Sequence, residues 1–395
     1  MQVYLAHIVT SAANAASIDA SRLGPIQAAK DSLAHWIATT GTQKPISLSS
    51  AVSGSPSRYA LHALSEPVWE RERESVWQSL PDNNTKAWFR SCGGMYAGMW
   101  LGVLPVAAYL RAANNVYVVA MLMRLQIPLP GLESGDVRCS NPKCQHGGLV
   151  DALGYHYGVC KRGAETGLSW SERHSQWLGY ILLAFRSLGI GSIRDAQGSR
   201  WALDAGRGKS IFADGVFSSL FGPGRHFFFD ISICDPRTKA AMEAPVSSVQ
   251  QAGVAAGLRG VQKAAKYTEP AFRIGGSGFA GAIGERTGAL GDGFVSLIKR
   301  FTGDGDRDSL LSHDYTFSAS SRTTYLAQRI VFSLVMADAW MVVQNSTVDS
   351  RSTARPSSDA GARVALAAYI GHPQDGGARG NGSRSRRGAT CGGGV

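Results

Sequence analysis

The feature that most constrains this chain is a cluster of metal-binding residue types near its middle. Three of its six cysteines lie within 22 residues of one another, beside two histidines. The ligand pattern is Cys139, four residues, Cys144, eleven residues, His156, three residues and Cys160. Zn²⁺ prefers thiolate and imidazole ligands, and two close pairs of them make a closed tetrahedral site. We therefore predict a structural zinc loop, because four protein ligands leave no open position for water.

Two alternatives to this ligand set are open in the sequence. His146 competes with His156 for the imidazole position, although a single residue separates it from Cys144, which strains a four-ligand arrangement. We favour His156 for that reason. The other alternative is a set of buried free cysteines beside two unrelated histidines, and short-spacing zinc patterns argue against it.

Composition indicates a globular protein with a polyanionic partner. The chain has 395 residues, is 44% hydrophobic and carries a net charge of +11, a balance that favours nucleic acid. Its most apolar region, 95–129, is interrupted by proline, arginine and asparagine, short of the ~20 apolar residues of a membrane helix. The N-terminus lacks a basic start and a continuous apolar stretch, so we expect no signal peptide and an intracellular, nuclear protein.

Hydrophobic periodicity predicts a helical first third followed by an α/β layer. We expect a helical scaffold or linker at 1–128, a zinc loop at 129–165, a catalytic α/β domain at 166–350 and a disordered basic tail at 351–395. The predicted helices are 26–39, 66–80, 115–126, 171–188, 254–267, 291–301 and 321–345. The predicted strands are 211–220, 226–234 and 272–274, with Gly222 to Gly224 as the turn between the first two.

Two aspartates fall on these strands. Asp214 lies in the first strand and Asp230 in the second, with fifteen residues between them, so paired neighbouring strands would bring both carboxylates to one end. Carboxylate oxygens converging there would hold Mg²⁺, which generates a hydroxide nucleophile and stabilises charge on a phosphodiester. Taken singly, Asp214 is also typical of a strand end and Asp230 of a surface cap.

The helix at 254–267 supplies the cations for such a site. Lys263 and Lys266 stand one turn apart, and Arg259 stands one turn before Lys263, so all three lie on or near one helix face. The sequence leaves open which lysine assists the reaction. Ser232, two residues after the second acid, occupies a position where many nucleases of this design carry the lysine.

Further candidates open the helix at 171–188. Glu172 could give a third carboxylate, although an acidic residue in a first helical turn is also favourable to the helix dipole. Arg173 and His174 stand beside it as candidate contacts to phosphate or substrate.

In this order the residues resemble a known family. The matching series is Cys139, Cys144, His156 and Cys160, then Arg173–His174–Ser175, Ala213–Asp214, Asp230, and Lys263–Ala264–Ala265–Lys266–Tyr267. It resembles the C-terminal zinc loop and restriction-like endonuclease of site-specific non-LTR retrotransposons, and related reverse-transcriptase-like proteins. The resemblance spans roughly residues 90–345.

This resemblance implies a restriction-endonuclease-like fold of PD-(D/E)xK type that nicks target DNA to prime reverse transcription. Asp214 and Asp230 would be ligands of a catalytic Mg²⁺, and Lys263 or Lys266 the helix-borne lysine. Arg173, His174, Arg259 and Tyr267 are the candidate nucleic-acid contacts. DNA is the expected partner, with the RNA of the parent element as a further candidate.

The chain departs from the family pattern in three respects. Ala213 replaces the usual proline, Ser175 replaces the usual asparagine, and the cysteine spacing is wider. Loss of the proline removes no ligand, but a hydroxyl has one donor where an amide has two. No paired-aspartate polymerase motif is found, so this chain is not expected to polymerise by itself. The alternative function is an inactive nucleic-acid-binding relic of such an element.

Overall fold

The structure is a computed structural model. It describes residues 69–352 apart from 104, 106, 134, 145–147, 161–169, 195–202, 205–209, 219–225, 274–275, 304–318 and 320. The predicted helix at 26–39, the glycine turn at 222–224 and the predicted disordered tail beyond 352 lie outside the described residues.

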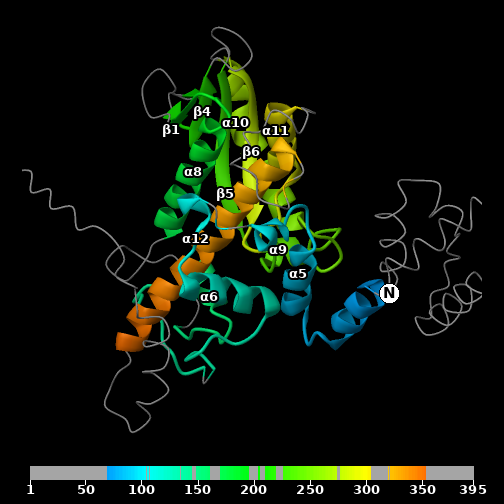
Figure 1. The fold of residues 1–395 in the computed structure, drawn as a ribbon, viewed down its shortest axis with the longest axis vertical. Helices are drawn as coiled ribbons and strands as arrows, with labels where there is room; N and C mark the ends of the chain where they lie inside the picture. The colour runs from blue at the N-terminus through cyan, green and yellow to red at the C-terminus, as the bar shows by residue number, and fades with distance from the viewer. Residues whose placement is uncertain are drawn as a thin grey trace, which may run out of the picture.

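A four-stranded mixed sheet forms the centre of the fold (Figure 1). Its strands are β1 (Ser192–Arg194), β4 (Gly215–Ser218), β5 (His226–Cys234) and β6 (Gly276–Glu285), in that spatial order. The first three strands pair antiparallel, whereas β6 pairs parallel to β5. Two short strands, β2 (Leu203–Asp204) and β3 (Ser210–Ile211), form a separate antiparallel pair.

Side chains along β5 point alternately to the two faces of the sheet, and the two faces pack against different groups of residues. Phe227, Phe229 and Ile231 point into the large hydrophobic core, where α8 (Trp170–Arg186) and α11 (Asp292–Thr302) pack. Phe228 faces the other way, into a small cluster that includes residues of α10 (Val254–Arg273). Asp230 shares the parity of Phe228, so it lies on the face of the sheet that α10 covers.

Helix α10 is the crossover connection between parallel strands β5 and β6, with the short α9 (Lys239–Met242) before it. Two parallel strands require a long crossover connection, which is usually helical. The crossover places the cationic residues of α10 directly above the strand that carries Asp230.

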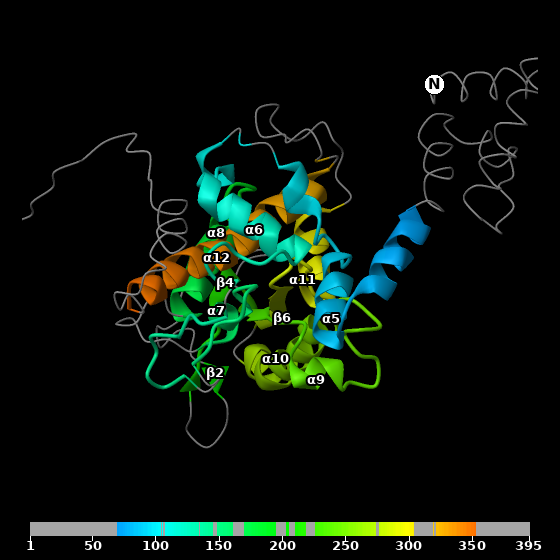
Figure 2. The ribbon, with the colours of Figure 1, turned by 90° about the horizontal axis from the view of Figure 1, so that it is seen from below.

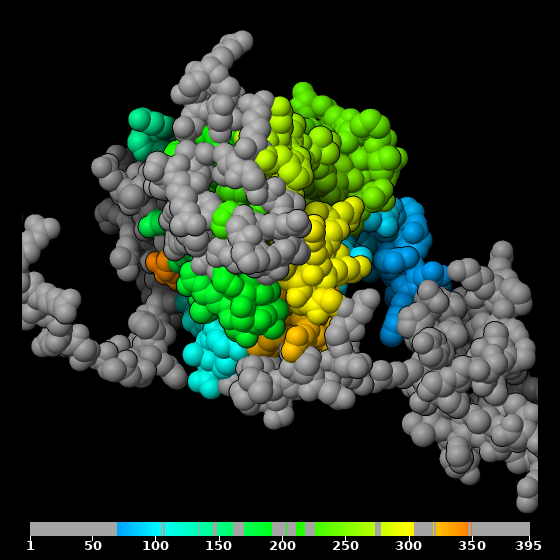
Figure 3. All heavy atoms as spheres, turned by 90° about the horizontal axis from the view of Figure 1, so that it is seen from above, coloured from blue at the N-terminus to red at the C-terminus, as the bar shows by residue number. Residues whose placement is uncertain are grey.

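The long helix α12 (Arg322–Ser352) crosses the molecule and contacts α6 (Asn114–Leu125), α8 and α11 (Figures 1 and 2). Its segment Arg322–Ser346 is long and apolar enough to cross a membrane, but 94% of an apolar 18-residue stretch in it is buried inside the protein. On the face drawn in Figure 3, only small patches of its orange surface are visible. Apolar residues all round the helix are explained by these partners.

Part of the N-terminal helical region, from Trp88 onward, shares the same core. Residues 69–79 are helical, and α5 (Asn83–Cys92), the 3₁₀ turns η2 (Met99–Gly102) and η3 (Ala108–Leu110), and α6 follow. Asp82 caps α5 by accepting a hydrogen bond from the Thr85 amide at 2.8 Å. Trp88 of α5 and Met123 of α6 belong to the same hydrophobic cluster as the sheet and α12.

The structure confirms the mixed helix and sheet class and corrects two strands. Residues 272–273, predicted as strand, form the end of α10, and the fourth strand is instead β6. The predicted strand at 211–220 is broken, because residues 212–214 separate β3 from β4. The strand predicted at 226–234 has the bounds of β5. The structure also confirms, to within a few residues, the helices predicted at 115–126, 171–188, 291–301 and 321–345, except that α12 ends later than predicted.

Candidate metal centre and carboxylate site

The four predicted zinc ligands meet at one point. Their ligand atoms all lie within 4.8 Å of one another. Cys139 Sγ is 3.7 Å from Cys160 Sγ, and Cys144 Sγ is 3.7 Å from His156 Nε2 and 3.9 Å from Cys160 Sγ. Tetrahedral Zn²⁺ with bonds of ~2.3 Å to sulfur has ligand–ligand edges of about 3.8 Å. The cluster could therefore hold a metal such as zinc.

Local hydrogen bonds explain why these ligands converge. An antiparallel bridge joins Arg138 to Leu149, and the Cys139 amide donates to the Gly148 carbonyl at 2.6 Å. The Asp151 carboxylate accepts from the Tyr155 and His156 amides at 3.0 and 2.7 Å. These amides open helix α7 (Tyr155–Val159), which carries His156 and is capped at its C-terminal end by Cys160.

The surroundings of the cluster fit a thiolate metal centre. Asn141 Nδ2 donates to Cys160 Sγ at 3.4 Å, the type of contact that stabilises a metal-bound thiolate. His156 and Cys160 are buried, and Cys139 and Cys144 are half-buried. The competing ligand His146 lies outside the described residues.

The two predicted acidic residues lie side by side on neighbouring strands. The register Gly215↔Phe229 places Asp214, just before β4, opposite Asp230 of β5. The Asp214 carboxylate accepts from the Ile231 amide at 2.8 Å and lies 3.2 Å from His174 Nε2 of α8. The break before β4 thus turns Asp214 toward the β5 backbone.

Helix α10 supplies the cation at this site. Lys263 Nζ donates to the Asp230 carboxylate, and both groups are largely buried. Arg259, one turn earlier, donates from Nε to Ser232 Oγ at 3.2 Å. Lys266 is exposed, and its Nζ donates to the Tyr267 hydroxyl at 2.9 Å rather than to either aspartate. The structure therefore brings Lys263, and not Lys266, against the carboxylates.

The environment separates the pKa values of the two carboxylates. Burial raises the pKa of Asp214, but the His174 ring, the Ile231 amide and Lys263 outweigh it, and the pKa lies below its ordinary value. Burial and the charge of Asp214 raise the pKa of Asp230, although Lys263 opposes the shift. Two carboxylates with unlike pKa values in one partly buried site are typical of metal-binding and acid–base sites.

Two predicted nucleic-acid contacts are corrected by their burial. The Arg173 guanidinium is 1% exposed and pairs with Asp338 of α12, so it cannot reach a phosphate at the surface. The Tyr267 ring is buried in the small cluster under α10 and stacks on Phe279, and it offers no free face to a base. Its hydroxyl does lie at the carboxylate site, where it also donates to the Phe212 carbonyl at 3.2 Å.

Glu172 does not join the carboxylates. It is exposed in the first turn of α8, two residues before His174. Residues two apart on a helix do not face each other, so Glu172 does not share the face that carries His174 toward Asp214. The alternative interpretation of Glu172, an acidic residue at a helix N-terminus, agrees with this placement.

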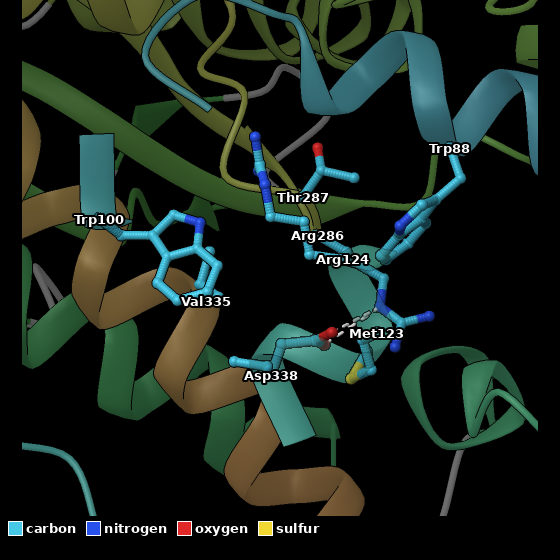
Figure 4. A pocket seen from close by; sticks show the side chains of 9 residues that line it. Trp88, Trp100, Met123, Arg124, Arg286, Thr287, Val335 and Asp338 are labelled. Atoms are coloured by element: carbon cyan, nitrogen blue, oxygen red, sulfur yellow. Dashed lines mark hydrogen bonds and ion pairs between the residues drawn. The ribbon is translucent and has the colours of Figure 1, made fainter. Parts of the chain in front are cut away.

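A buried network of charges links the two sites. Asp338 accepts from both Arg173 and Arg286, and Asp235, which follows β5, accepts from Arg286 and Arg237. Figure 4 shows two members of this network, Arg286 and Asp338, beside a small cavity that Trp88 and Trp100 approach from opposite sides. Sequence reasoning missed the network, because its members lie far apart in the chain and form no motif.

Comparisons of the chain with family models, with curated proteins and with solved structures return no match.

Proposed function

We propose that this protein is a metal-dependent DNA endonuclease module, related to the restriction-like nucleases of non-LTR retrotransposons. One observation carries the proposal: Asp214, Asp230 and Lys263 meet on the face of the sheet that α10 covers. These groups come from two neighbouring strands and the following helix. That arrangement is what a carboxylate-held metal ion with an assisting lysine requires.

The order of elements supports a restriction-like core. A helix, α8, precedes three antiparallel strands, and the crossover helix α10 leads to a parallel fourth strand. Asp230 lies on β5 and Asp214 lies directly before β4, and these are the two inner strands of the sheet. The acid–acid–lysine order named in the resemblance therefore falls on consecutive elements of one layer.

Asp214 and Asp230 would hold Mg²⁺, a hard ion that prefers carboxylate oxygens. Among the described residues no hydrogen bond reaches Asp214 Oδ1, which leaves this oxygen for a metal ion. The bound ion would supply a hydroxide nucleophile and Lewis-acid stabilisation of the phosphodiester. Lys263 places its ammonium at Asp230, where it would balance negative charge that develops on the phosphate.

The other parts have supporting roles in this proposal. The Cys/His cluster would hold zinc as a structural ion, because its four ligands leave no position for substrate. His174 and Arg259 remain candidate contacts to the nucleic acid, since both lie at the edge of the site. A net charge of +11 favours DNA, and the RNA of a parent element, as partners in the nucleus.

Cleavage of a supercoiled plasmid tests the proposal. Zinc-loaded protein is incubated with plasmid and Mg²⁺, and nicked product is measured with time. Asp214→Asn and Asp230→Asn keep the shape of each side chain and remove a metal ligand, so each is expected to lower nicking at least about 100-fold. Glu243→Gln, which neutralises an exposed carboxylate in an i,i+4 pair with Lys239, is the matched control.

Two results would contradict the endonuclease proposal. Nicking that is equal in the wild-type protein and in both asparagine variants would come from a contaminant or from another site. Salt-sensitive DNA binding without any nicking by the wild-type protein would support the alternative, an inactive nucleic-acid-binding relic.

A further inference from the structure

The metal-binding helix α7 is fixed to the rest of the fold by two buried arginines. Arg173 NH2 donates to the Gly158 carbonyl at 3.2 Å, and Arg286 NH1 donates to the Tyr155 carbonyl at 3.1 Å. These carbonyls lie near the two ends of α7, a helix of five residues. The arginines thus hold the backbone of the helix that carries His156 and leads to Cys160.

The contact between Arg286 and α7 is close enough to require glycine. A Cβ added to Gly158 would lie 1.9 Å from Arg286 Cζ and 2.2 Å from its NH1. Any larger residue at this position would therefore displace the guanidinium. The arginine packs directly on the surface of α7 as well as bonding its backbone.

Both guanidinium groups also donate to buried carboxylates. Asp338 of α12 accepts from Arg173 NH1 and, at 2.9 Å, from Arg286 Nε. Asp235, directly after β5, accepts from Arg286 NH1 at 2.9 Å. Both aspartates are buried, and a buried ion pair of this kind is strongly destabilised when one partner moves away. The position of α7 is thereby tied to α12 and to the end of β5.

Arg173 also connects α7 to the carboxylate site. It is the residue directly before His174, whose ring lies 3.2 Å from the Asp214 carboxylate. Both residues belong to the first turns of α8. A displacement of Arg173 would therefore carry the backbone of His174 with it.

We propose that Arg173 and Arg286 act as a clamp that couples metal binding at the Cys/His cluster to the position of α8. Metal fixes α7 at His156 and Cys160, and the clamp transfers this order to the first turns of α8. Both arginines are positioning residues, since they are buried and act on backbone carbonyls of α7 and on the carboxylates of Asp235 and Asp338. Only the last step, from His174 to catalysis, rests on the proposed nuclease function.

Amide hydrogen exchange of the full chain tests the clamp without measuring activity. Exchange in residues 170–178 is compared with zinc bound and after removal of zinc by a chelator. In the wild-type protein, zinc removal is expected to speed this exchange on the order of tenfold, the effect of losing about one hydrogen bond. Arg173→Lys keeps the positive charge, but a single ammonium group cannot reach both Asp338 and the Gly158 carbonyl. Exchange in this variant is therefore expected to be fast with or without zinc.

Two further variants complete the experiment. Arg286→Lys is expected to repeat the result of Arg173→Lys, and it replaces that variant if Arg173→Lys does not fold. Arg124→Lys is the matched control, because Arg124 also donates to two backbone carbonyls, of Ala97 and Cys92, but contacts neither α7 nor α8. It should keep the wild-type response to zinc.

The clamp is overturned if zinc removal leaves α8 exchange unchanged in the wild-type protein. It is equally overturned if both lysine variants of the clamp respond to zinc as the wild type does. Neither outcome depends on plasmid nicking. A protein that shows the coupling but does not nick DNA would count against the proposed function alone.

Discussion

Replacing Gly158 by alanine should destabilise the protein, although alanine is the better helix former. The new Cβ would lie 1.9 Å from Arg286 Cζ, so the guanidinium must leave its contacts with Asp235 and Tyr155. Breaking a buried ion pair costs about 3–5 kcal/mol. The gain in helix propensity returns about 1 kcal/mol. The net loss expected for the free energy of unfolding is therefore roughly 2–4 kcal/mol.

Gly260→Ala is the matched control for this prediction. Gly260 lies inside α10, and a Cβ added there would meet no atom within 4 Å. The same chemical change should therefore stabilise the protein by about 0.5–1 kcal/mol, because alanine loses less backbone entropy on folding. If the free energy of unfolding falls for Gly158→Ala and rises for Gly260→Ala, the loss at Gly158 is due to the buried arginine rather than to alanine itself.

Urea unfolding of zinc-loaded protein, followed by circular dichroism, measures both variants. The midpoint should fall for Gly158→Ala and rise for Gly260→Ala at an unchanged slope, which indicates a change in stability alone. A Gly158→Ala protein as stable as the wild type would show that Arg286 moves freely. The reasoning on the buried network, and with it the clamp, would then fail.

Three further predictions concern the metal centre, the lysine and pH. Removing zinc with a chelator should lower the thermal unfolding midpoint by several degrees, measured by calorimetry. Cys160→Ser should show this lower midpoint without chelator. Equal midpoints with and without zinc would contradict a structural metal site. Lys263→Ala should slow plasmid nicking at least about 100-fold and Lys266→Ala only a few-fold, measured as initial rates; the reverse order would move the assisting cation to Lys266. Burial raises the pKa of Asp235, but Arg237 and Arg286 outweigh it and hold that pKa well below its ordinary value. The stability that this depressed pKa contributes is complete above about pH 4 and is lost as the pH drops toward the folded-state pKa of Asp235. Below about pH 4, the unfolding free energy of Asp235→Asn should therefore fall less steeply with decreasing pH than that of the wild type. Parallel curves of unfolding free energy against pH would contradict this prediction.

The sequence alone was sufficient to identify the Cys/His cluster and most of the helices. Cys139, Cys144, His156 and Cys160 lie within 22 residues, a separation that short turns can close. The helices follow from apolar residues at helical spacing, a signal that each segment carries by itself. Strand β5 was found in the same way, from its run of phenylalanine and isoleucine.

Only the tertiary structure decided the remainder. Strand β6, with the sequence GSGFAGAIGE, has little intrinsic strand preference, and its conformation depends on pairing with β5 and cover from α10. Lys263 and Lys266 are equivalent in sequence, but only the register of α10 on β5 directs Lys263 to Asp230. Arg173 looked like a surface contact until Asp338, 165 residues away, proved to be its partner. Burial and long-range pairing are properties of packed elements, which no local pattern encodes.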